Sequence, residues 1–221
     1  MRTETAVRAA TVTAWMHETA DVVGIQRDYL TQLDAAIGDG DHGTNMNRGF
    51  EAVEKALAGQ NGDVPPGRLL ILAGKTLVST VGGASGPLWG SALRAAGRSL
   101  GDAETFDGPA LAQALDAAIA AVVDLGAAAP GDKTMIDALV PGRDALRAAL
   151  DGGATFADAL RQSATAAEQG VRDTIPLVAR KGRASYLGER SAGHQDPGAT
   201  SSHLLLQTAA ETWGDSEEGT G

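Results

Sequence analysis

Apolar residues recur at intervals of three and four positions along nearly the whole chain. This spacing places apolar side chains on one face of an α-helix, and no segment has the alternating, β-branched pattern of a strand. We therefore expect an all-α fold, a bundle of eight antiparallel amphipathic helices. The helices are predicted at residues 4–32, 44–59, 66–81, 87–100, 108–125, 133–150, 155–179 and 199–213.

The pattern continues to residue 213 without a linker or an internal repeat, so residues 1–213 are expected to form a single domain. The remaining residues, GDSEEGTG, are polar and acidic. Such a composition cannot bury enough apolar surface to fold. We expect residues 214–221 to form a disordered acidic tail.

Glycine and unusual polar residues are concentrated in alternate loops, at residues 34–43, 81–86, 126–133 and 181–198. Helices joined by short loops tend to pack antiparallel, so alternate loops lie at the same end of a bundle. The other connections read as ordinary turns. The end that carries the four glycine-rich loops is therefore the candidate site.

Composition excludes several classes of function. The chain has no cysteine, which excludes disulfides and thiolate metal sites. Its formal net charge of −10 argues against nucleic acid as a partner. No apolar stretch approaches the length of a membrane span, and the N-terminus lacks the apolar core of a signal peptide. We expect a cytoplasmic protein with neither a membrane nor a nucleic-acid partner.

The stretch AIGDGDHGTN, residues 36–45, has the glycine spacing of a dinucleotide-binding turn, but the segment before it reads as a helix and not as the strand which that motif requires. Asp39 and Asp41 flank one glycine, and Asp34 lies just upstream. Three nearby carboxylates repel one another unless a cation neutralises them, and all-oxygen ligands suit Mg²⁺. The alternative is that these aspartates only shape turns and cap helices.

A bound Mg²⁺ would in turn hold phosphates. The amides near Thr44 and Asn45, at the start of the next helix, are expected to face that anion. Two other loops lead into a helix through a proline, at Pro87 and Pro197, which is a favoured first helical residue.

The third glycine-rich loop offers Asp132 or Thr134 as a cap for the helix that follows. Lys133 and Asp137 are four residues apart, and we expect them to form a surface pair. The fourth loop, at 181–198, is too long for a plain connection, which favours a lid.

Four motifs, LDAAIGDGDHGTNM, GGASGPLWG, PGDKTMIDAL and RASYLGERSAGHQDPGATS, occur in this order along the chain. Together they resemble the L subunit, the nucleotide-binding domain, of bacterial dihydroxyacetone kinases. The resemblance covers roughly residues 5–213. It implies a barrel of eight antiparallel helices with ADP or ATP bound at one end, in agreement with the loop pattern.

The resemblance also implies roles for individual residues. Two Mg²⁺ ions would be held by Asp34, Asp39 and Asp41. Arg183 would help to neutralise charge during phosphoryl transfer. The nucleotide would contact His42, Gly43, Thr44, Asn45, Ala84, Ser85, Gly126, Met135, Arg183, Asp196, Pro197 and Gly198.

In that family a K subunit holds dihydroxyacetone covalently on a histidine, and the L subunit presents the phosphoryl donor. A phosphotransferase-system M subunit rephosphorylates the bound ADP with phosphate from phosphoenolpyruvate. The chain is thus expected to be a kinase subunit that uses ADP, ATP and Mg²⁺. The alternatives are a kinase that exchanges free ATP, a nucleotide-loaded module that signals to a transcriptional regulator, and a helical protein whose loops bind cations only structurally.

Overall fold

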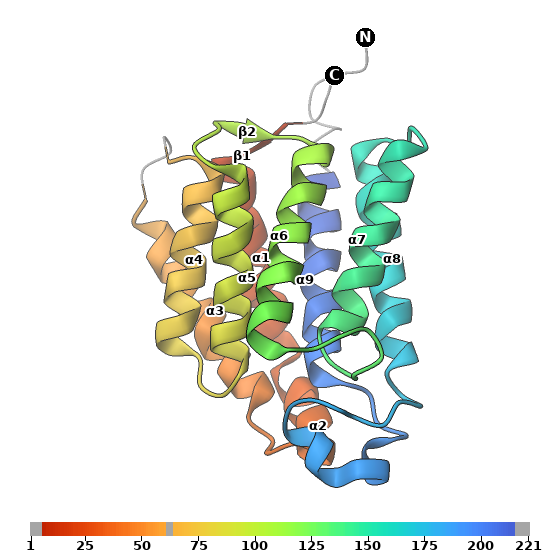
Figure 1. Ribbon diagram of the computed structural model, residues 1–221. Coiled ribbons are helices and arrows are strands. Elements are labelled where there is room, and N and C mark those ends of the chain that lie inside the picture. Colours follow the sequence, from red (N-terminus) through yellow and green to blue (C-terminus); the bar gives the residue numbers. More distant parts are fainter. Residues whose placement is uncertain (1–5, 61–63, 215–221) are drawn as a thin grey trace.

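The computed structural model describes residues 6–60 and 64–214. Within these residues eight helices form a closed ring, in which each helix packs on the next and the last packs on the first (Figure 1). The ring confirms the predicted bundle. Its members are α1 (Ala9–Ile25), α3 (His42–Ala58), α4 (Pro66–Thr80), α5 (Ser85–Leu100), α6 (Gly108–Gly126), α7 (Ile136–Asp151), α8 (Phe156–Asp173) and α9 (Pro197–Gly214).

Two further helices lie at one end of the ring, at the bottom of Figure 1: α2 (Arg27–Ile37) and the 3₁₀ helix η1 (Arg183–Ser191). At the opposite end, the two-residue strand β1 (Val7–Arg8) pairs antiparallel with β2 (Thr105–Phe106). The glycine-rich loops all lie at the end that carries α2 and η1. The predicted alternation of loops is therefore confirmed.

Aromatic side chains close the ring between its first and last helices. Trp15 of α1 and Trp213 of α9 pack edge to face with ring centroids 4.9 Å apart, and Phe106 packs on Trp213 from β2. The Trp15 indole N–H donates to the carbonyl of Leu205 and to the hydroxyl of Thr208, both at 3.1 Å. Buried aromatic groups thus find polar partners, as stable cores require.

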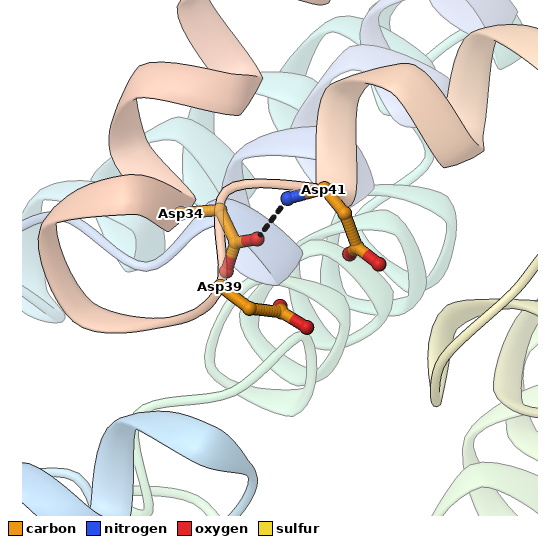
Figure 2. Close-up of side chains that lie close together, drawn as sticks. All are labelled: Asp34, Asp39 and Asp41. Atoms are coloured by element: carbon orange, nitrogen blue, oxygen red, sulfur yellow. Dashed lines mark hydrogen bonds between the residues drawn. The ribbon is translucent and has the colours of Figure 1, made fainter.

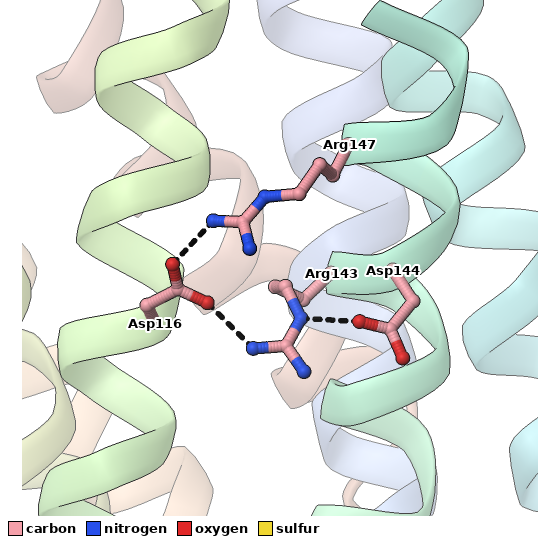
Figure 3. Close-up of polar contacts among 4 residues, drawn as sticks. All are labelled: Asp116, Arg143, Asp144 and Arg147. Atoms are coloured by element: carbon pink, nitrogen blue, oxygen red, sulfur yellow. Dashed lines mark hydrogen bonds and ion pairs between the residues drawn. The ribbon is translucent and has the colours of Figure 1, made fainter. Parts of the chain in front are cut away.

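The helices are joined around the ring in different ways. The backbones of α4 and α5 approach closely at Gly74 and Gly90, where a Cβ on either glycine would lie within 2.7 Å of the other's carbonyl oxygen. Long side chains join α6 and α7 instead, because Asp116 of α6 forms ion pairs with both Arg143 and Arg147 of α7 (Figure 3). The packing of α6 on α7 therefore depends more on ion pairs than the packing of α4 on α5 does.

Two helix boundaries differ from the prediction. The helix expected over residues 4–32 is interrupted at Gln26, where the chain turns so that Leu30 and Ile37 of α2 become buried across the end of the bundle. The helix expected over 155–179 ends at Asp173. Pro176 accounts for the second difference, since proline disfavours helical geometry in the residue before it.

Most of the acidic tail predicted for residues 214–221 lies outside the described residues, and Gly214 is the last residue of α9. Among the described helices, α6 alone has the length and the mean hydropathy, 1.4, to cross a membrane. In the ring it packs between α5 and α7, with Leu111, Ile119 and Val122 buried. Packing in the core accounts for its apolar composition.

We predict that the Asp116–Arg143 pair stabilises the ring by about 1 kcal/mol, because Arg143 is only 20% exposed and a partly buried pair is screened less than a surface pair. A double-mutant cycle with Asp116→Asn and Arg143→Met, read by chemical denaturation, measures this coupling. The control cycle uses the exposed pair Arg68–Asp102, for which we expect a smaller coupling energy. Equal coupling energies in the two cycles would contradict the prediction.

Candidate functional site

A cavity of about 340 Å³ opens at the end of the ring that carries the glycine-rich loops. Its volume lies in the range of small-molecule sites, about 300–1,000 Å³. All four loops contribute to its wall. Of the predicted site residues, it is lined by Asp34, Asp39, Asp41, His42, Ala84, Ser85, Gly126, Met135, Arg183, Asp196, Pro197 and Gly198.

Three carboxylates form one corner of this cavity. Asp34, Asp39 and Asp41 each offer an oxygen, and these oxygens lie within 4.8 Å of one another (Figure 2). Three carboxylates without nitrogen or sulfur are the donor set that Mg²⁺ prefers, with water and phosphate oxygens completing the shell. The described residues therefore fit a magnesium ion here.

Asp34 lies in the last turn of α2, where the helix dipole disfavours negative charge. The next helix offsets this cost. The amides of Asp41 and His42 donate to Asp34 Oδ2 at 2.9 and 3.1 Å, so one carboxylate caps the start of α3 and also faces the cavity.

Two of the glycines in this loop are required by close contacts. A Cβ at Gly38 would overlap the Asp34 carboxylate, and a Cβ at Gly43 would overlap the backbone carbonyl of Arg27 in α2. The glycine spacing thus permits the fold of the carboxylate loop and the packing of α3 on α2. It does not mark a dinucleotide-binding turn.

His42 connects three parts of the site. It is buried, with its Nδ1 3.1 Å from the hydroxyl of Ser85 and its Nε2 3.1 Å from the hydroxyl of Ser201. Burial lowers the pKa of the imidazole, which favours the neutral ring with one donor and one acceptor nitrogen. Ser201, on α9, was not among the residues predicted from the sequence.

Three of the predicted contacts do not line the cavity: Gly43, Thr44 and Asn45. Gly43 is buried against α2. The amide of Asn45 donates to the carbonyl of Asp41 within the helix, and its side chain accepts from Arg48. The expectation that the Asn45 amide faces an anion is therefore wrong.

Part of the cavity wall is apolar and was not predicted from the sequence. Leu88 of α5 and both Val122 and Leu125 of α6 line it. Leu125 is 53% exposed, which is unusual for a leucine at the end of a core helix. The site therefore has an apolar part and an acidic part, a combination that suits a ligand with a flat ring at one end and metal-bound phosphates at the other.

Asp196 caps α9 from inside the structure. Its Oδ2 accepts the amide of Ala199 at 2.7 Å, and the side chain is buried. Burial raises the pKa of this carboxyl to about 7. The capped turn places Pro197 and Gly198 on the cavity wall.

The structure of the third loop contradicts one prediction, the surface pair of Lys133 and Asp137. Lys133 does not form a surface pair with Asp137. It is only 1% exposed, and its ammonium donates to backbone carbonyls outside its own loop. Asp137 instead accepts the amides of Gly131 and Thr134 and shapes the start of α7. Of the two predicted caps, Thr134 accepts the amide of Ile136, the first residue of α7, at 3.2 Å, whereas Asp132 accepts the amide of Ala129 within its own loop.

The long fourth loop contains η1, whose first residue is Arg183. The Arg183 Nε lies 3.0 Å from Asp39 Oδ2, so this guanidinium reaches the carboxylate corner from the far side of the cavity. Arg183 is 66% exposed and Asp39 35% exposed. The pair is therefore accessible to solvent, and another anion can compete for the arginine.

Residues 36–211 match the family model described as the DAK2 domain. The chain is 44% identical over 197 residues to the PEP-dependent dihydroxyacetone kinase, ADP-binding subunit DhaL, of Escherichia coli (strain K12), covering 89% of this chain and 93% of that one. It is 42% identical to the L-erythrulose 1-kinase of Mycolicibacterium smegmatis (strain ATCC 700084 / mc(2)155) over 82% of this chain, and this match spans only 32% of that kinase.

Solved structures show the same arrangement of helices. The crystal structure of the dihydroxyacetone kinase from C. freundii in complex with AMP-PNP and Mg²⁺ aligns with a TM-score of 0.66 and 27% identity, over 92% of this chain and 33% of that one. The native form of that kinase aligns with a TM-score of 0.70 and 26% identity, over 96% and 36%. The chain therefore belongs to the DAK2 domain family and, within it, to the DhaL subunits.

Proposed function

We propose that this protein is the ADP-binding subunit of a dihydroxyacetone kinase, which passes a phosphoryl group from a Mg²⁺-bound nucleotide to dihydroxyacetone held by a K subunit. The observation that carries the proposal is the carboxylate corner of Asp34, Asp39 and Asp41, which shares a single cavity with apolar side chains. The names of the DhaL relatives and the nucleotide complex of the C. freundii kinase support it.

The chain's own residues would act by positioning. The three aspartates would hold the metal, Ser85 and His42 line the cavity, and Arg183 reaches Asp39 from η1. Two Mg²⁺ ions held by these carboxylates would neutralise the charge of the phosphates. No side chain in the cavity needs to act as a nucleophile in this scheme.

The phosphoryl source is part of the same proposal. Relatives named PEP-dependent and PTS-dependent support rephosphorylation of bound ADP by an M subunit in the cytoplasm. The similarity to L-erythrulose 1-kinase favours a second candidate, a ketose kinase that exchanges free ATP. A link from the nucleotide state to a transcriptional regulator would be an additional role.

One experiment separates the two phosphoryl sources. The purified protein is denatured and the released nucleotide identified, and the native protein is then tested with the K subunit and either free ATP or a phosphorylated M subunit. Retained ADP with turnover only from the M subunit supports the first candidate. Turnover with free ATP supports the second, and the absence of nucleotide binding under all conditions would refute both.

We predict that Asp39→Asn and Asp41→Asn each weaken Mg²⁺-dependent ADP binding by about 100-fold, or ~2.8 kcal/mol. The reason is that a neutral amide oxygen binds a divalent cation more weakly than an ionised carboxylate does. Both side chains are exposed, so the helical circular dichroism should stay unchanged. Isothermal titration measures the affinity. Glu104→Gln, at the β1–β2 end of the ring, is the control and should leave it unaltered, whereas unchanged binding in both aspartate variants would rule out this metal site.

We predict that Arg183→Ala lowers phosphoryl transfer or nucleotide affinity by about 10- to 100-fold, on the scale of a charge-assisted contact, ~1.5–3 kcal/mol. Its guanidinium lies against Asp39 at the carboxylate corner, where the phosphates would be. Arg190→Ala in the same helix is the matched control, because Arg190 does not line the cavity. ADP titration and transfer to the sugar-loaded K subunit measure the effect. Equal values for the two variants would mean that Arg183 is only a surface charge.

A further inference from the structure

Lys133 is a buried cation that borders the cavity and has no role in the proposed reaction. Its side chain is 1% exposed, and its ammonium lies 2.6 Å from the carbonyl of Thr174 and 3.5 Å from that of Ile175, while also donating to the carbonyl of His194. Burial of an ammonium is unfavourable unless its donors are satisfied. Here neutral carbonyls satisfy them, with the carboxylates of Asp196 and Asp137 near enough to favour the charge.

The carbonyls that receive this lysine lie at the two ends of one segment. Residues 174–175 and 193–196, here called the neck, come together below the lid loop, residues 176–192, which contains η1. The amide of Gly193 donates to the carbonyl of Ile175 at 2.7 Å, and the amide of Asp196 donates to the Thr174 hydroxyl at 3.0 Å. Lys133 reaches the neck from the third loop, and its ammonium donates hydrogen bonds to backbone carbonyls in both segments of the neck.

The backbone of Lys133 is strained, with a φ of +63° that few non-glycine residues adopt. Among the described residues the one other non-glycine with positive φ is Ala127, in the same loop, at +48°. Strain of this kind persists only where the surroundings hold it, and it is concentrated at ligand-binding sites. The lysine tether is one contact that holds the third loop in this shape.

We propose that Lys133 is a positioning residue for nucleotide binding, which fixes the third loop to the neck and so sets the places of Met135, Arg183 and the turn from Asp196 to Gly198 around one ligand. The inference rests on the proposed function. The first loop, with its three carboxylates, makes no contact with this lysine. The two halves meet at the exposed Arg183–Asp39 pair, so a change at Lys133 should affect the ADP contacts more than the carboxylates.

The test is Lys133→Met, which keeps the length and volume of the side chain but removes its donors. In isothermal titrations at a temperature where the variant is fully folded, we expect ADP affinity in the presence of Mg²⁺ to fall by about tenfold or more, and the affinity for Mg²⁺ alone to change by less than about twofold. Lys133→Arg keeps the charge and donors and should recover part of the ADP affinity.

Limited trypsin digestion tests, in the absence of nucleotide, whether Lys133 restrains the lid loop. The lid loop contains the exposed Arg180, Arg183 and Arg190 and the half-buried Lys181, and loss of the tether should speed cleavage at these sites by about tenfold. The control for general destabilisation is Leu146→Ala, a buried core change on α7. It should lower the melting temperature without altering ADP affinity or the rate of cleavage in the lid loop.

The outcomes distinguish a failure of the proposed function from a failure of the positioning role of Lys133. If the wild-type protein binds no ADP, the proposed function is wrong, and the trypsin comparison alone decides whether Lys133 restrains the lid loop. If the wild type binds ADP and Lys133→Met binds it equally well, the positioning role is refuted. A parallel loss of ADP affinity in Leu146→Ala would also refute it, because the effect would then follow from stability.

Discussion

The Asp34 carboxylate accepts the amides of Asp41 and His42 and so joins the last turn of α2 to the first turn of α3. This contact decides the path of the loop between the two helices. Because of that path, the carboxylates of Asp39 and Asp41 face the same cavity as Asp34. A negative charge that would weaken α2 by itself is stabilised by the dipole of the next helix. The same group is thereby held ready for a cation.

Much of the fold could be predicted from the sequence, because a ring of helices depends on local periodicity and on the parity of its loops. The interruption at Gln26 could not, since no proline marks it and the turn is stabilised by burial of Leu30 and Ile37 at the bundle end. Pro176 is a local indication that α8 ends before it, but the helical spacing of apolar residues continues past this proline.

The carboxylate corner was predictable because its ligands lie within eight residues of one another in the first loop. Lys133 was misjudged for the opposite reason. A lysine four residues before or after an aspartate usually forms a surface pair, and only the packing of the neck makes it a buried donor. Ser201 and the apolar wall at Leu88 and Leu125 are likewise products of tertiary contacts between separate helices.

The separate apolar and acidic parts of the cavity restrict how a nucleotide can bind in it. Under the proposed function, the base is favoured against Leu88 and Leu125, while metal-bound phosphates are favoured at the aspartates. Arg183 reaches the aspartates from the lid loop and is itself exposed, while the apolar side chains belong to the ring helices α5 and α6. Phosphoryl transfer requires the acceptor to approach the terminal phosphate in line. Under the proposed function, a sugar carried by another subunit must therefore enter beside η1, where displacing the exposed Arg183–Asp39 pair costs little.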